Sequence, residues 1–207
     1  MEPPLPILGP DRIEEVVERV LGGGIVAIPT DTVYGLACLP MHEAALNALA
    51  DLKGRDRDQP VAALIDSVAD AIPYLDATTS LDAFVRFWPG ALTVIVRARA
   101  NVAGGGLLPP VVTEEGTVGI RKPDDRFARH VIRSCGGILA VTSANHHGAP
   151  PCTSAEEVLA EFGEAMMVLD GGGRTGGLAS TVVDVTGERP RIVRAGPITA
   201  ANLGIEG

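Results

Sequence analysis

The stretch from Ile25 to Leu36 reads IVAIPTDTVYGL, and its two halves differ in chemical character. The first four residues are apolar and largely β-branched, which is typical of a buried strand. Pro29 ends that strand, because proline cannot donate a hydrogen bond to a sheet ladder. Small polar side chains follow at once, accompanied by Gly35. We therefore predict a core strand that leads directly into a polar turn.

The residues on either side of this stretch predict further helices and strands. Asp11 and Glu14 resemble a capping box, and the apolar residues from Ile13 to Leu21 fall on one helical face. Further helices are predicted at 42–52, at 126–134 and from Ser154 to near Gly163, with the end of another at 81–88. Strands are predicted at 60–65, 92–96, 117–121, 138–141, 167–169, 181–185 and 192–194, and a long loop at 98–115.

The order of these elements predicts the fold class. Because helices and strands intermix without a regular βα repeat, we expect an α+β fold rather than a doubly wound parallel one. It should have three layers, with a mixed, twisted β-sheet flanked by helices. The chain of 207 residues shows no internal repeat and no linker-like stretch, so we expect a single domain over residues 1–207.

Composition limits the classes of partner. The formal net charge of −9 argues against a protein held to nucleic acid by a broad basic surface, since such binding requires many phosphate contacts. We therefore expect binding to nucleic acid to be weak at most. A local basic pocket for one anionic ligand is compatible with this charge.

Cysteine usage and hydropathy indicate the compartment. Cys38, Cys135 and Cys152 are odd in number and widely spaced, so neither a disulfide framework nor a zinc site is predicted. We expect reduced thiols packed as small hydrophobes. No uncharged apolar run reaches the ~18 residues of a membrane span, and the N-terminal residues do not resemble a signal peptide. We therefore expect a cytoplasmic location without membrane association.

Three polar, glycine-bearing segments follow predicted strands directly, at 29–36, 141–145 and 171–174. Small hydroxyl and amide side chains beside glycine suit a ligand that approaches the backbone closely. Ordinary turns are the alternative for any one segment. The presence of three together favours a binding site.

Basic residues at the ends of predicted elements are candidates for gripping phosphates or a carboxylate. Lys53 and Arg55 follow a helix, whereas Arg121 and Arg194 each end an apolar strand. Solvated surface charges are the alternative, and they fit Arg57 best, since it is flanked by two aspartates. The chain has no GxxxxGK[ST] or GxGxxG motif and no metal-ligating histidine spacing. We therefore expect no metal ligated by the chain itself.

An ordered set of short motifs runs from about Gly22 to Gly196. It consists of PTDTVYGL at 29–36, KGR at 53–55, WPG at 88–90 with LT at 92–93, TVGIR at 117–121 with Pro123, SAN at 143–145 with Gly148, STVVD at 180–184, and Arg194 with Gly196. This set resembles the YrdC-like family of threonylcarbamoyl-adenylate synthases, in its short single-domain form. The resemblance implies a mixed-sheet fold with a concave, cationic site.

The resemblance also implies an activity. Members of this family condense L-threonine with bicarbonate or CO2 and join the carbamate to AMP from ATP, releasing pyrophosphate. The product, threonylcarbamoyl-AMP, passes to a separate tRNA threonylcarbamoyl transferase, which modifies an adenosine beside the anticodon. Magnesium is expected to accompany ATP.

The resemblance assigns roles to particular positions. Threonine contacts are expected from Thr32, Arg121, Val141 and Ser180. ATP contacts are expected from Arg55, Gln59, Thr117, Ser143, Pro151 and Arg194. A catalytic polar tetrad is expected from Lys53, Arg55, Ser143 and Asn145. After Asn145 the family usually has one variable residue, then serine and glycine, whereas this sequence has His146, His147 and Gly148. Pro151-Cys152 stands where a Ser-Pro pair is common in the family.

Two other functions remain open from the sequence. One is a related carbamoyl-transfer enzyme, or a paralogue with altered activity, on the same fold. The other is a non-enzymatic RNA-binding module. The net charge and the 3% aromatic content disfavour the RNA-binding module, because single strands stack on aromatic side chains. Strong, salt-sensitive RNA binding without ATP turnover would identify that module.

Overall fold

The structure is a computed structural model that describes residues 7–100, 102, 105–163 and 166–205. Its strands are β1 (Ile7–Leu8), β2 (Val26–Ile28), β3 (Gly35–Cys38), β4 (Ala62–Ile65), β5 (Leu92–Arg97), β6 (Thr117–Arg121), β7 (Ile138–Ser143), β8 (Met167–Leu169), β9 (Thr181–Asp184) and β10 (Arg191–Arg194). Its α-helices are α1 (Ile13–Leu21), α2 (Glu43–Lys53), α3 (Val68–Ala71), α4 (Arg126–Ser134), α5 (Ala155–Phe162) and α6 (Ala200–Leu203). Short 3-10 helices lie at Pro10–Arg12, Ile72–Tyr74 and Val85–Phe87.

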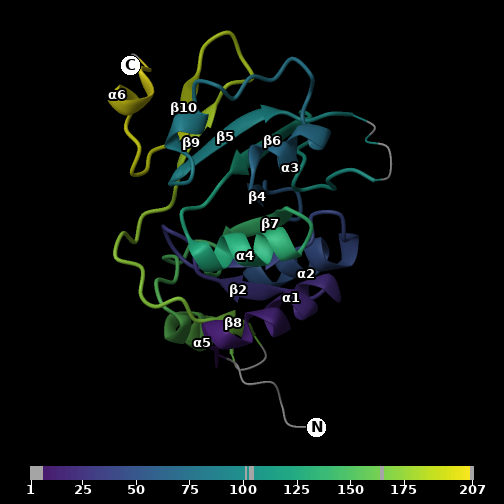
Figure 1. Ribbon diagram of the computed structural model, residues 1–207, viewed down its shortest axis with the longest axis vertical. Coiled ribbons are helices and arrows are strands. Elements are labelled where there is room, and N and C mark those ends of the chain that lie inside the picture. The colour runs from purple at the N-terminus through teal and green to yellow at the C-terminus, as the bar shows by residue number, and fades with distance from the viewer. Residues whose placement is uncertain (1–6, 101, 103–104, 164–165, 206–207) are drawn as a thin grey trace.

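The described strands form one mixed sheet in the order β1-β8-β2-β3-β7-β4-β6-β5-β9-β10 (Figure 1). The pairs β1/β8, β2/β8, β4/β6 and β5/β9 are parallel, and the other neighbours are antiparallel. This arrangement confirms the predicted mixed sheet. The antiparallel pairing of β2 with β3 turns the polar segment at 29–34 into the connection between two central strands.

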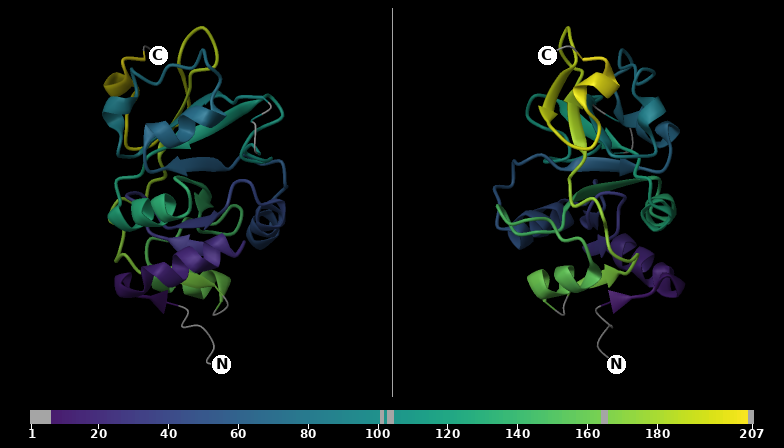
Figure 2. Two further views of the ribbon diagram at one scale, coloured as in Figure 1. Left: turned by 45° about the vertical axis from the view of Figure 1, so that its right-hand side comes forward. Right: turned by 90° about the vertical axis from the view of Figure 1, so that its left-hand side faces the viewer.

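Helices cover both faces of the half of the sheet that contains β2, β3 and β7, as the three-layer prediction requires. On one face α1 and α4 pack together (Figure 1). They bury Val16, Val20, Val131 and Ile132 against the strands. The other face carries α2 and α5, seen on the opposite side of the sheet in the right-hand view of Figure 2.

The half of the sheet formed by β5, β6 and β9 has a different arrangement. Along each of these strands, alternate residues point to opposite faces. Val94, Ile120 and Val183 belong to the hydrophobic core on one face. The intervening positions, including Ile95 and Gly119, line an open cavity on the other face. That uncovered face positions the candidate site.

Several element predictions are confirmed, and others are wrong for local reasons. The bounds of β6, α4 and β8 agree with those predicted. The region 81–88 contains only a short 3-10 helix at Val85–Phe87. Asp11 lies within a 3-10 helix and makes no capping bond to α1, whose N-cap is Arg12. The Ser154 cap is confirmed, because its hydroxyl accepts from the amide of Glu157.

Two further predictions concern the long loop and membrane segments. Of the loop predicted at 98–115, residues 101, 103 and 104 lie outside the described residues, and the described remainder contains no helix or named strand. Among the described residues, no helix has the length and apolar character needed to cross a bilayer.

Candidate active site

A cavity of about 810 Å³ lies on the uncovered face of the sheet. Its wall is built from β4, β5, β6, β7, β9 and β10, together with the turn between β2 and β3. Seven of the residues predicted from the sequence line it: Thr32, Thr117, Arg121, Val141, Ser143, Ser180 and Arg194. The fold thus brings together side chains that are up to 162 positions apart in the chain, from Thr32 to Arg194.

Arg121 forms one corner of the cavity, at the end of β6. Its Nη2 pairs with Asp31 Oδ1 at 2.5 Å and its Nη1 donates to Thr32 Oγ1 at 3.0 Å. Its Nε donates to the carbonyl oxygen of Gly90 at 3.0 Å. Burial is the main influence on the Arg121 pKa and lowers it, while the charge of Asp31 raises it. An arginine has five N–H donors, so Arg121 keeps a second donor on both Nη1 and Nη2 for a ligand.

Ser180 and Arg194 form a second corner. The hydroxyls of Ser180 and Thr93 lie 2.8 Å apart in the buried floor. Arg194 donates from Nη2 to Ser180 Oγ and from Nε to the Ser180 carbonyl oxygen, each at 3.1 Å. The side chain of Arg194 is thereby held against the start of β9. Thr93 is a member of this cluster to which the sequence analysis assigned no role.

Lys53 does not line the cavity but lies behind Ser143. Its Nζ donates to the carbonyl oxygens of Ser143 and Asn145 at 2.6 and 2.7 Å, and to Asn145 Oδ1 at 3.2 Å. An ammonium has three N–H donors, and all of them are used here. Burial, reinforced by the charge of Arg55, lowers the pKa of Lys53 to about 8. Lys53 therefore fixes the backbone that follows β7.

The rest of the predicted tetrad surrounds this lysine. Ser143 Oγ donates to Asn145 Oδ1 at 2.6 Å, and the Asn145 amide holds the loop carbonyls of His146 and Ala149. The Nε and Nη2 atoms of Arg55 are buried with no hydrogen-bond partner among the described residues. Because an unpaired buried donor is costly, this guanidinium is suited to receive an anion.

Gln59, Asn145, Arg55 and Pro151 also lie outside the lining of the main cavity. Gln59 is next to Pro60, which does line it. Pro151 lines a separate pocket of about 560 Å³. The imidazole of His146 packs against Phe162, with 4.9 Å between ring centroids. The two histidines are thus absent from the main cavity wall as the structure describes it.

The charges on the cavity wall are more balanced than the sequence suggested. Arg121, Arg191 and Arg194 are accompanied by two carboxylates, Glu115 and Asp184. The ion pair of Arg121 with Asp31 was not predicted, although Asp31 lies in the polar turn at 29–36. Its position between Thr30 and Thr32 was the feature of the sequence that could have marked it as a site residue.

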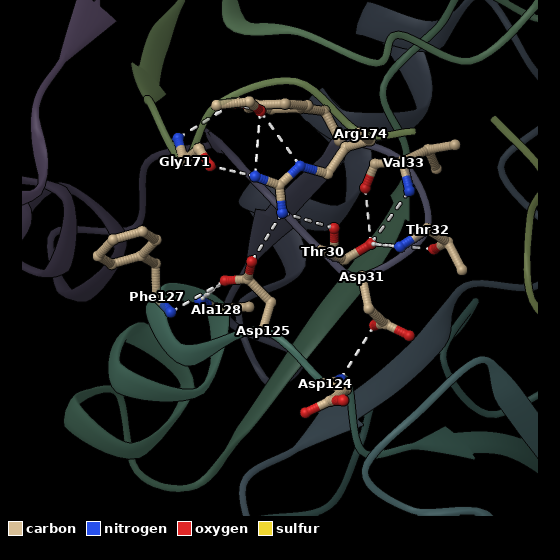
Figure 3. A network of polar contacts seen from close by, with 12 residues as sticks. Thr30, Asp31, Thr32, Val33, Asp124, Asp125, Phe127, Ala128, Gly171 and Arg174 are labelled. Carbon is tan, nitrogen blue, oxygen red and sulfur yellow. Dashed lines mark hydrogen bonds and ion pairs between the residues drawn. The ribbon is translucent and has the colours of Figure 1, made fainter. Parts of the chain in front are cut away.

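The third polar segment, at 171–174, is not part of the cavity lining but contacts the turn that is. A side chain at Gly171 would meet Pro29, with its Cβ only 2.5 Å from Pro29 Cγ, so glycine is required for this close packing. Arg174 contacts the backbone of Thr30 and pairs with Asp125 (Figure 3). The segment therefore supports the turn that carries Thr32.

The residues that the structure describes offer neither a reactive thiol nor a metal cage. Cys38, Cys135 and Cys152 are free and buried, as expected. Burial raises the pKa of Cys38 to about 12 and the pKa values of Cys135 and Cys152 to about 11. Within the described part of the chain, no group of three or more His, Cys, Asp or Glu side chains could hold a metal ion.

The chain is similar to proteins of a known family. The Sua5/YciO/YrdC family model, described as telomere recombination, matches residues 18–196. A threonylcarbamoyl-AMP synthase of Chromohalobacter salexigens is 36% identical over 84% of this chain and 93% of its own length. One from Bacillus subtilis is 36% identical over 86% of this chain, which spans 51% of that protein.

A solved structure extends the comparison to three dimensions. The crystal structure of Pyrococcus abyssi Sua5 complexed with L-threonine matches with a TM-score of 0.87 and 28% identity. The match covers 95% of this chain and 59% of the Pyrococcus abyssi chain. The sequence motifs, the mixed sheet and these relatives lead to one conclusion: the chain belongs to the Sua5/YciO/YrdC family.

Proposed function

We propose that this chain is an L-threonylcarbamoyl-adenylate synthase that uses L-threonine, bicarbonate or CO2, and ATP. The observation that carries the proposal is the corner formed by Arg121, Thr32 and Asp31. A buried arginine with two free donors beside a hydroxyl suits the carboxylate and side-chain hydroxyl of an amino acid. The family membership and the threonine complex of a relative support the same assignment.

In the first step, the neutral amine of threonine attacks CO2, and an N–C bond forms as one C=O electron pair moves onto oxygen. The amine proton passes to water, which leaves a carbamate. Arg121 holds the threonine carboxylate, and Val141 and Ser180 line the space around the amino acid. Fixing the amine near its partner replaces a bimolecular encounter with one inside the cavity, which lowers the entropic part of the barrier.

In the second step, a carbamate oxygen bonds to the α-phosphorus of ATP, and the bond from that phosphorus to the β-phosphate oxygen breaks. Pyrophosphate leaves with the electron pair. Two anions must approach each other, so cationic groups stabilise the transition state. Arg55 has the unpaired buried donors for this role, and Ser143, Thr117 and Arg194 line the wall where ATP would lie. Gln59 and Pro151 would complete the nucleotide contacts.

Magnesium would enter with ATP as its phosphate complex. Mg²⁺ commonly binds through substrate phosphates and water with few protein ligands, which fits a chain whose described residues offer no metal cage. The product would pass to a separate tRNA threonylcarbamoyl transferase in the cytoplasm, with weak tRNA binding at most by this chain itself.

The test is to incubate the protein with ATP, L-threonine, bicarbonate and magnesium, and to measure threonylcarbamoyl-AMP and pyrophosphate. Both products should require all three substrates together. Release of pyrophosphate at an unchanged rate without threonine would contradict the proposal. Strong, salt-sensitive RNA binding without turnover would favour the RNA-binding alternative.

A further inference from the structure

The guanidinium of Arg174 joins three segments that are distant in the sequence. Its Nη1 donates to the carbonyl oxygen of Thr30 at 3.2 Å and to Asp125 Oδ2 at 2.8 Å. Its Nη2 donates to the carbonyl oxygens of Gly171 and Gly172, and its Nε donates to Gly172 at 3.1 Å. Every N–H donor of the side chain is therefore engaged (Figure 3).

The side chains of this arginine and of its carboxylate partner are largely buried. Its side chain is 13% exposed and that of Asp125 is 9% exposed. Asp125 is also the N-cap of α4, where its Oδ1 accepts from the amides of Phe127 and Ala128, each at 2.9 Å. The guanidinium carbon lies 5.9 Å from the centroid of the buried Tyr34 ring. Arg174 thus ties the 171–174 segment to the start of a core helix.

The turn that Arg174 holds is the one that meets Arg121. Thr30 Oγ1 accepts from the amides of Thr32 and Val33, at 3.2 and 3.3 Å, and lies 3.0 Å from Thr32 Oγ1. Thr32 Oγ1 in turn accepts from Arg121. A displacement of Thr30 would therefore move the hydroxyl that stands beside the proposed threonine carboxylate site.

We propose that Arg174 is a positioning residue for threonine binding, acting through the Thr30–Val33 turn and anchored by Asp125. The proposal rests on the proposed function, since threonine is the ligand whose binding is expected to depend on this turn. Arg174 does not line the cavity, so its effect must be transmitted through Thr30 and Thr32. A lysine could carry the charge but could not reach the carbonyls of three residues and Asp125 in one planar arrangement.

The decisive experiment compares Arg174→Gln, Arg174→Lys and Asp125→Asn with the wild-type protein. Asp125→Asn keeps an oxygen to cap α4 but places an N–H donor toward Arg174. It therefore breaks the contact with Arg174 and retains the helix cap. Each variant should raise the KM for threonine by about 10-fold or more, since small displacements from the reactive geometry cost up to ~10²-fold. The KM for ATP should change by less than about 2-fold. Arg133→Gln, at an exposed arginine paired with Asp66, is the matched control and should behave as wild type.

A double variant separates positioning from a general loss of stability. If Arg174 acts through Thr32, the effects of Arg174→Gln and Thr32→Val should overlap. The fold-increase in the threonine KM of the double variant should then be smaller, by a factor of at least about 3, than the product of the two single fold-increases. An effect equal to that product would overturn the proposal. So would an unchanged KM for threonine in folded variants, or an equal rise in the KM values for both substrates.

A readout without substrate makes the test independent of the enzyme assay. Amide hydrogen exchange at Thr32 and Val33 should be faster in Arg174→Gln than in wild type, because their acceptor is no longer held. Unchanged exchange at both amides would contradict the proposal that Arg174 holds the Thr30–Val33 turn. If the wild-type protein formed no threonylcarbamoyl-AMP while exchange was still faster in the variant, the proposed function would be wrong. The role of Arg174 in holding the Thr30–Val33 turn would still be supported.

Discussion

Asp31 Oδ1 lies 2.5 Å from Arg121 Nη2, and the two side chains are only 15% and 7% exposed. The arginine predicted to hold a substrate carboxylate is therefore already paired with a carboxylate of the protein. Asp31 Oδ1 also accepts from the amide of Asp124 at 3.0 Å, so the aspartate is itself fixed. This pair orients the guanidinium before threonine arrives, and the donors that remain free define where a ligand carboxylate can bind.

The orientation of Arg121 should matter as much as its charge. Arg121→Lys keeps the charge but loses the planar fork, so the KM for threonine should rise about 10-fold or more, while the KM for ATP stays near wild type. Steady-state kinetics with each substrate varied in turn would check this. Arg133→Lys, on the surface, provides the matched control. Near-wild-type threonine kinetics in Arg121→Lys would show that the carboxylate binds elsewhere.

The role of Asp31 can be divided into geometry and charge. Asp31→Asn retains an oxygen for both Arg121 and Asp124, whereas Asp31→Ala removes the acceptor and leaves a buried arginine unpaired. Breaking a buried pair in that way typically costs ~3–5 kcal/mol, so Asp31→Ala should be much less stable than Asp31→Asn. Asp31→Ala should therefore have a lower Tm and a higher KM for threonine than Asp31→Asn, as thermal unfolding and steady-state kinetics would show. Equal behaviour of the two variants would remove orientation as the reason for the pair.

Arg55 gives a prediction with an unusual sign. Its buried Nε and Nη2 lack partners among the described residues, and burial lowers its pKa. Replacement by an apolar side chain, Arg55→Met, should leave the ligand-free protein as stable as wild type or more stable by about 1 kcal/mol. The same variant should lose most of the increase in Tm that ATP and magnesium give the wild type. Thermal unfolding with and without ATP measures both. A full ATP-dependent shift in the variant would contradict the assignment of Arg55 to the nucleotide.

Lys53 predicts a pH dependence. Its pKa of about 8 lies below the usual lysine value because of burial, so its ammonium form is present below pH 8 and is lost as the pH rises. Loss of that charge removes a donor from the Ser143 and Asn145 network, and kcat/KM should therefore fall above about pH 8. The amine of threonine becomes more reactive over the same range, which opposes this fall. Lys53→Arg, whose side chain stays charged, should shift the falling limb to higher pH. If the fall of kcat/KM occurred at the same pH in Lys53→Arg, a group other than Lys53 would cause it.

Amino-acid selectivity tests Thr32 and Ser180. Both hydroxyls are at the cavity wall and take part in networks, Thr32 with Arg121 and Ser180 with Thr93. A site that bonds a substrate hydroxyl strongly rejects a methyl isostere, whereas a missing methyl costs only ~1–3 kcal/mol. Turnover should therefore decrease from threonine to serine to valine. Valine turnover equal to or above that of serine would show that the pocket selects shape rather than the hydroxyl.

The sequence predicts the parts of the fold that have a strong local pattern. Strand β6 and helix α4 agree with their predicted bounds because their apolar residues recur at the spacing of a strand and of a helix. Strand β3 was missed, because Gly35 follows a polar turn and its strand conformation comes from pairing with β2 and β7. Tertiary pairing overrides a weak local preference there.

The site could be predicted only in part for a related reason. Motif order identified Thr32, Arg121 and Ser180, which the fold gathers in one cavity. The contacts of Arg174 could not be predicted, since Thr30 is 144 positions away and Asp125 is 49 positions away. No local pattern encodes such a bridge. Likewise, the sequence does not show that all three N–H donors of Lys53 bond to Ser143 and Asn145, because this depends on the fold bringing the end of β7 next to Lys53.

Along β5, β6 and β9, adjacent residues have different roles, because one packs in the core and the next lines the cavity. Truncating Val94, Ile120 or Val183 would remove core packing and threaten the fold. Replacing their neighbours on the cavity face, such as Ile95 or Val182, would mainly alter the surroundings of a bound ligand. Ligand preference and foldability can therefore change almost independently on these strands. Such a scaffold can diverge toward a new small substrate by successive single substitutions, each of which leaves the core intact.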